Sequence, residues 1–158
     1  MKIKEFILKK REDSKGARDF YISAEAHKDF LTPIQEELNK YSLEMTEIIL
    51  YSILLSAKNR KNKLGHSTRS GDYSQKNKPT DPPKAVFNIT NLDASKLEFL
   101  LSVMVDLYGD ESIFDYREMI KSLEELAEEG LEILYNKYSQ DYLISPSKFI
   151  DDIFYGKL

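Results

Sequence analysis

Side chains that could bind a polyanion are concentrated in residues 58–84, which we term the basic segment. Its cationic residues are Lys58, Arg60, Lys61, Lys63, Arg69, Lys76, Lys78 and Lys84. The only acidic residues in the same stretch are Asp72 and Asp81. Because the whole chain has a net charge of −4, this segment is a local positive field on an acidic protein.

Lysine and arginine side chains neutralise phosphates and release counterions from nucleic acid. We therefore predict a DNA-binding surface in this segment, formed by Lys58, Arg60, Lys61, Lys63, Arg69, Lys76 and Lys78. The alternative is a solvated, flexible loop that connects two helices and binds nothing.

A second charged cluster lies near the C-terminus and is acidic. It comprises Glu124, Glu125, Glu128, Glu129 and Glu132. Like charges four residues apart on a helix repel one another mildly. A cation, a basic partner or the chain's own basic segment could relieve that repulsion, and a solvated helix face is the alternative. Ferritin-like metal sites need a Glu-x-x-His pattern, and no histidine is near, so we expect no metal here.

Catalytic motifs are missing from the sequence. The two histidines, His27 and His66, are far apart, and the chain has no cysteine. There is no Gly-rich phosphate loop, no nucleophile elbow and no His-Glu-x-x-His. We therefore expect a protein that is not an enzyme and carries no cofactor.

Length and composition are typical of one globular domain. The chain has 158 residues, of which 41% are hydrophobic and 32% charged. Its longest apolar run, residues 48–55, is much shorter than the roughly 20 residues that span a bilayer. The N-terminal stretch lacks the apolar core of a secretory signal. We expect no membrane association, and the absence of cysteine fits a cytoplasmic location.

The spacing of apolar residues predicts a mainly α, compact helical domain with one or two short strands. In the N-terminal half, residues 2–10 and 17–23 fit a strand–turn–strand arrangement, and a frayed helix over residues 2–10 is the alternative. Ser23 is a candidate N-cap for a helix that reaches about Asn39. Pro33 should kink or restart that helix. A further helix is expected from Ser42 to Ala57.

The C-terminal half continues the pattern with a short strand at residues 85–90. Asn91 or Asp93 should cap the helix that follows, and Gly109 should end it. The longest helix is predicted to begin near Ser112, and Ser145-Pro146 should begin a last one. The inward face of the longest helix is expected to comprise Tyr116, Ile120, Leu123, Ala127, Leu131, Leu134 and Tyr138.

The helix predicted at residues 42–57 is apolar on nearly every side from Ile48 onward, which indicates a central helix covered by neighbours or by another subunit. We therefore expect self-association, with an interface formed by Ile48, Ile49, Tyr51, Leu54 and Leu55.

Three stretches carry a resemblance to a known family: residues 20–26 (FYISAEA), 49–57 (ILYSILLSA) and 129–134 (EGLEIL). Together with the order of the elements, they make residues 17–138 similar to the DndE-like proteins of DNA sulfur modification (phosphorothioation) systems. The resemblance implies a helical homo-oligomer that binds duplex DNA, intact or nicked, as a non-catalytic partner of the sulfur-inserting machinery. Only the cluster at residues 58–63 matches that family's lysines, while the long basic segment and the extension from Tyr142 depart from it.

The leading hypothesis is thus a non-catalytic DNA-binding component of a DNA modification or defence complex, which contacts phosphates and does not read bases. The second hypothesis is a helical protein–protein adaptor in which the basic segment is inert. The third is a ribbon-helix-helix regulator, in which residues 18–23 would enter the major groove.

Overall fold

The computed structural model describes residues 5, 9, 19–38, 43–62, 81–142, 148, 151–152 and 155. Most of these residues are helical, and the strands form a single two-stranded sheet. The predicted fold class, mainly α with short strands, is therefore confirmed.

The sheet is antiparallel and joins β1 (Asp19–Ile22) to β2 (Lys84–Asn88). The buried ring of Phe20 stacks on Phe87 with 4.7 Å between the ring centroids. Of the predicted strand–turn–strand arrangement, the second strand is present as β1, and it pairs with the strand after the basic segment. Most of residues 2–10 lie outside the described part of the chain.

Ser23 ends the strand and begins a helical rod. Its side-chain oxygen accepts a hydrogen bond from the backbone N–H of Ala26, as predicted for an N-cap. The rod runs through α2 (Ala24–Ala26), the π-helical η1 (His27–Leu31) and α3 (Thr32–Leu38). The wide η1 turn places Pro33 in the first turn of α3, where its missing N–H costs least. The predicted restart at Pro33 is confirmed.

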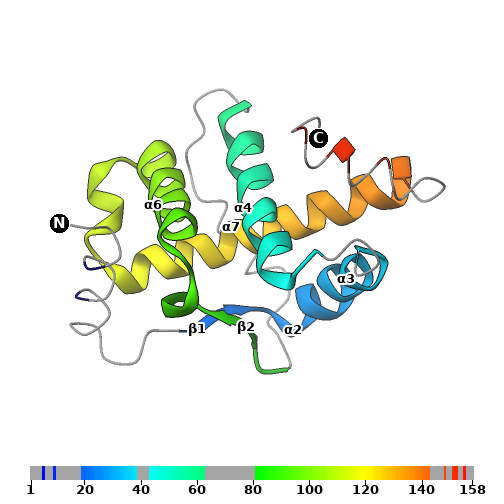
Figure 1. Ribbon diagram of the computed structural model, residues 1–158, viewed down its shortest axis with the longest axis horizontal. Coiled ribbons are helices and arrows are strands. Elements are labelled where there is room, and N and C mark those ends of the chain that lie inside the picture. Colours follow the sequence, from blue (N-terminus) through cyan, green and yellow to red (C-terminus); the bar gives the residue numbers. More distant parts are fainter. Residues whose placement is uncertain are drawn as a thin grey trace.

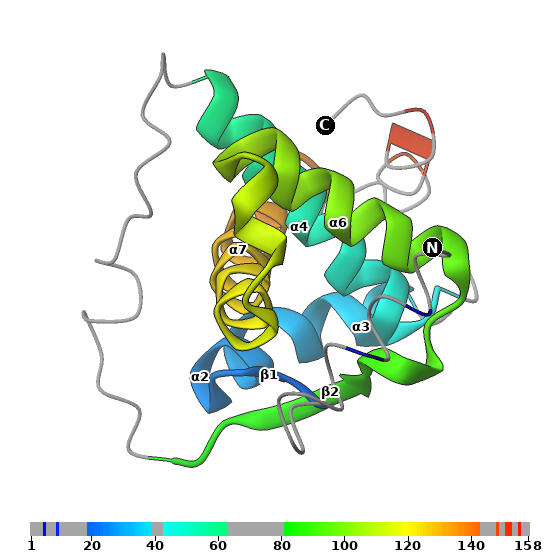
Figure 2. The same cartoon turned by 90° about the vertical axis from the view of Figure 1, so that its left-hand side faces the viewer.

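Helix α4 (Met45–Asn62) is longer than predicted, because the first residues of the basic segment continue it beyond Ala57. It packs between α6 (Ala94–Tyr108) and α7 (Tyr116–Lys137). Figure 1 shows α4 and α6 side by side, both crossing the long α7, with the sheet at the bottom of the view. Figure 2 shows the same crossing nearly along the axis of α7.

Capping residues set the ends of the C-terminal helices. Asp93 caps α6 through the N–H of Lys96, and Gly109, with φ of 89°, follows its last residue. The prediction that Ser112 begins the longest helix is wrong. Ser112 lies in the 3₁₀ turn η4 (Asp110–Ile113), and Asp115 caps α7 instead.

The predicted inward face of α7 is confirmed, since every residue assigned to it is buried. These residues are Tyr116, Ile120, Leu123, Ala127, Leu131, Leu134 and Tyr138. Helix α7 packs against α4, β1 and η1, and the core fills the space between these elements. The remaining elements are the 3₁₀ turn η3 (Ile89–Asn91) and the π-helical η5 (Tyr138–Tyr142). The helix predicted from Ser145 lies largely outside the described residues.

Candidate functional site: the basic end of α4 and the α4–α6 groove

The basic segment begins on a helix, because Lys58, Arg60 and Lys61 belong to the last turns of α4. Lys58 is exposed and has no ion pair among the described residues. Lys61 is also exposed and forms an ion pair with Asp106 of α6, in which both side chains remain half exposed or more. Exposed pairs of this kind contribute little stability. Both lysines are therefore accessible to a ligand.

Arg60 is placed differently from its neighbours. Its guanidinium donates to a single carboxylate oxygen of Glu129, from Nε at 2.9 Å and from a terminal nitrogen at 2.7 Å. It also donates to the hydroxyl of Tyr108. The residue is only 6% exposed.

These contacts correct the assignment of Arg60 to the DNA-binding set. A buried guanidinium is stable only with its carboxylate and hydrogen bonds in place, so it is not available to a phosphate. Arg60 instead attaches the basic end of α4 to α7.

The other predicted DNA-binding residues, Lys63, Arg69, Lys76 and Lys78, lie outside the described residues. Lys84, at the far end of the basic segment, is exposed at the start of β2. The structure thus describes both ends of the segment and leaves accessible cations at each.

The acidic cluster on α7 is not a uniform solvated face. Glu124 accepts a hydrogen bond from the backbone N–H of Tyr21, and Glu128 accepts one from Ser23. Glu129 accepts from Arg60 and, at 3.5 Å, from the side chain of Asn59. Of the possibilities left open for this cluster, the chain's own basic segment provides the countercharge for Glu129.

Burial changes the acidity of one of these carboxyl groups. The pKa of Glu124 is raised to about 7, chiefly by desolvation and further by the charges of Glu128 and Glu125. The hydrogen bond from the Tyr21 N–H acts in the opposite direction and is outweighed.

The two glutamates also occupy the edge of β1 that β2 leaves open. In a ribbon-helix-helix protein, this strand would pair with the same strand of a second chain. Here one edge of β1 pairs with β2 and the other donates to α7. This arrangement argues against the ribbon-helix-helix hypothesis.

The residues predicted to mediate self-association separate into two groups. Ile48, Ile49 and Leu55 are buried in the core of the single chain. Assigning them to a subunit interface is therefore corrected, because α7 and α6 already cover them. Tyr51 and Leu54 lie on the partly exposed side of α4 and line a groove.

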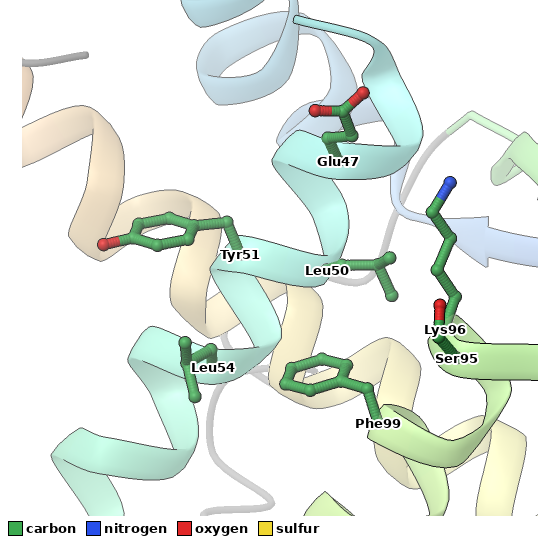
Figure 3. A pocket seen from close by; sticks show the side chains of 7 residues that line it. All are labelled: Glu47, Leu50, Tyr51, Leu54, Ser95, Lys96 and Phe99. Atoms are coloured by element: carbon green, nitrogen blue, oxygen red, sulfur yellow. The ribbon is translucent and has the colours of Figure 1, made fainter. Parts of the chain in front are cut away.

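This groove, of about 300 Å³, runs between α4 and α6. In Figure 3, Leu50, Tyr51 and Leu54 project from α4 and Phe99 extends from α6 toward α4, while the ring of Tyr51 points away from α6. Its remaining lining residues are Glu47, Ser95 and Lys96. Burial raises the pKa of the Tyr51 hydroxyl, and the nearby carboxylate of Asp152 raises it further.

Sequence analysis did not identify the groove residues of α6. Lys96 and Phe99 fall between residues that the helical spacing assigns to the core, and only the packing of α6 against α4 brings them to one surface. The partial signal was on α4, where an apolar residue at nearly every position exceeds what one buried face requires.

Neither histidine forms part of a catalytic or metal-binding cluster in the described residues. The ring of half-buried His27 lies 3.5 Å from the Thr32 hydroxyl, and His66 is outside the described part of the chain. Within the same residues, no three acidic or histidine side chains are grouped to hold a metal ion.

No protein-family model, curated protein or solved structure matches this chain. None of the helices in the described residues has the length and apolar character to cross a membrane.

Proposed function

We propose that this protein is a non-catalytic DNA-binding component of a DNA modification or defence complex. The observation that carries the proposal is the pair Lys58 and Lys61 on the last turns of α4. Both are exposed and three residues apart, so they project from neighbouring positions of one rigid helix end. The remaining cations of the basic segment follow directly in the sequence.

Binding would be electrostatic and independent of base sequence. Lys58 presents its ammonium to solvent, and Lys61 exchanges the carboxylate of Asp106 for a phosphate at small cost, because their ion pair is already solvated. Arg60 contributes indirectly by holding the helix end against α7 through Glu129. Phosphate contacts position a protein on a duplex without reading its bases.

The modification context rests on the resemblance of residues 17–138 to DndE-like proteins. That context would make intact or nicked duplex DNA the ligand, and the protein partners would be the catalytic subunits of a sulfur-modification complex.

Fluorescence anisotropy across a salt series tests the proposal. Labelled intact and nicked duplexes are titrated with the wild type and with the double variant K58S/K61S. We expect affinity to fall steeply with salt, and the salt slope to decrease by about one for each phosphate contact removed. A preference for the nicked duplex would support the sulfur-modification context.

The matched control is K28S/K121S, which removes two exposed lysines from η1 and α7. It loses the same charge as K58S/K61S but from outside the basic segment, so it should bind like the wild type. Equal affinities for the two double variants, or no binding by folded wild type at low salt, would overturn the proposal.

A protein–protein adaptor is the second candidate, favoured by the partly exposed apolar side chains of the α4–α6 groove.

A further inference from the structure

The α4–α6 groove exposes apolar surface that the single chain does not fully cover. Leu50, Tyr51 and Leu54 of α4 and Phe99 of α6 are each only partly buried. They adjoin one another along a hollow of about 300 Å³. Covering contiguous apolar surface of this kind with another apolar surface removes it from water, which lowers the free energy.

The charged residues of the groove lie on opposite walls. Glu47 belongs to α4 and Lys96 to α6 (Figure 3). Among the described residues, the ammonium of Lys96 forms an ion pair only with Asp93, at 3.8 Å across a solvated helix turn, so it is available for a stronger contact.

This placement makes the groove complementary to itself. In a two-fold symmetric interface each contact occurs twice, with the two residues exchanged between the subunits. When the two-fold axis runs along the groove, α4 of one copy faces α6 of the other. Glu47 then meets Lys96 of the partner subunit, while the aromatic and aliphatic side chains of the two walls cover one another.

We propose that a second copy of this chain occupies the α4–α6 groove, forming a two-fold symmetric homodimer with two Glu47–Lys96 ion pairs. The interface centres on Leu50, Tyr51, Leu54 and Phe99, in place of the buried Ile48, Ile49 and Leu55. The proposal does not depend on DNA binding, because the basic end of α4 takes no part in it.

The competing occupant is the chain itself. Asp152 lies close enough to Tyr51 to affect the acidity of its hydroxyl, so this residue approaches the same side of α4. If the chain itself filled the groove, the protein would be monomeric, and charge changes at positions 47 and 96 would leave its mass unchanged.

Variants that reverse the charge at position 47 or 96 distinguish these outcomes. Sedimentation equilibrium of the full chain measures their association. The single variants E47K and K96E each place like charges opposite one another at both symmetric contacts. Each should raise the dimer dissociation constant roughly tenfold or more, because like charges at an interface are strongly unfavourable. The double variant E47K/K96E should dimerise like the wild type.

Mixing the two single variants gives the most specific result. Every contact between an E47K chain and a K96E chain pairs opposite charges, so we expect a heterodimer from two proteins that are each mainly monomeric. The control variants E36K and K121E make the same charge changes on exposed positions of α3 and α7 and should dimerise normally.

Three results would overturn the proposal: a monomeric wild type, single variants that dimerise normally, or a mixture that does not associate. Circular dichroism of each variant confirms that it is folded, so that loss of association is not loss of structure. DNA anisotropy on the same variants shows whether the groove and the basic end of α4 act separately.

Discussion

The backbone of Gly130 in α7 lies directly against the carbonyl group of Ser52 in α4. A β-carbon added to Gly130 would come within 1.7 Å of the Ser52 carbonyl oxygen and within 2.3 Å of its carbon. Both residues are buried. The crossing of the two helices therefore depends on the absence of a side chain at this position, since helix axes approach this closely only where small residues meet.

Substituting Gly130 tests that dependence. In an isolated helix Gly→Ala would add about 1 kcal/mol of stability. Here the clash is with backbone and cannot be relieved by turning a side chain, so we expect G130A to lower the free energy of unfolding by roughly 2 kcal/mol or more. Urea unfolding measures the change. K121A, on the exposed side of the same helix, should stay within about 0.5 kcal/mol of the wild type, and a G130A protein of normal stability would contradict this packing.

The Arg60–Glu129 contact provides a second prediction. E129Q removes the countercharge from a buried guanidinium, and we expect a loss of about 3 kcal/mol of stability. The double variant R60M/E129L replaces the pair with apolar side chains of similar size, and should lose less than E129Q alone. A double-mutant cycle of R60M, E129L and R60M/E129L, measured by urea unfolding, isolates the coupling. Additive losses would show that the two side chains do not interact.

Glu124 predicts a pH dependence of stability. Its pKa is about 7 in the folded chain, above the ordinary value of 4.5, so the folded state holds the proton more tightly than the unfolded state does. This favourable contribution is complete below pH 4.5, decreases as the pH rises and is lost above pH 7.

In E124Q the side-chain amide oxygen can still accept the hydrogen bond from the Tyr21 N–H, but the side chain cannot ionise. We expect E124Q to gain stability relative to the wild type as pH rises from 5 to 8, by up to about 3 kcal/mol. Urea unfolding at a series of pH values measures the difference. Parallel pH profiles for the two proteins would show that Glu124 has an ordinary pKa.

The N-terminal cap of α7 gives a fourth prediction. The carboxylate of Asp115 accepts from the backbone N–H groups of Arg117 at 3.0 Å and Glu118 at 3.2 Å. D115A should therefore cost about 1 kcal/mol. D110A, which removes an exposed aspartate from η4 without removing a cap, is the matched control. In thermal unfolding, D115A should have a lower melting temperature than D110A.

Periodicity predicted the parts of this protein that depend on short-range order. The three- and four-residue spacing along residues 116–138 identified the buried face of α7, because a helix places those positions on one side. Ser23 was identified as a cap, and Asp93 as one of two candidates with Asn91, because a short polar side chain before an apolar run satisfies the free amides of a first turn. Pro33 marked an interruption for a similarly local reason.

Pairings between distant residues could not be predicted in this way. Nothing in the spacing indicates that β1 pairs with residues 84–88, or that Glu124 and Glu128 cover its other edge. Arg60 looks like its neighbours in the sequence, yet it is buried and they are exposed. The difference arises from its position on α4, which points it at Glu129 across the contact between two helices.

The sequence by itself thus determined the helical fold, its caps, the apolar character of α4 and the concentration of cations after it. Only the tertiary structure decided which of those cations are accessible, which glutamates are buried and which side of α4 forms a groove with Phe99. The physical reason is that hydrophobic spacing and capping act within a few residues. Burial of a charge or exposure of an apolar side chain depends instead on which elements pack together.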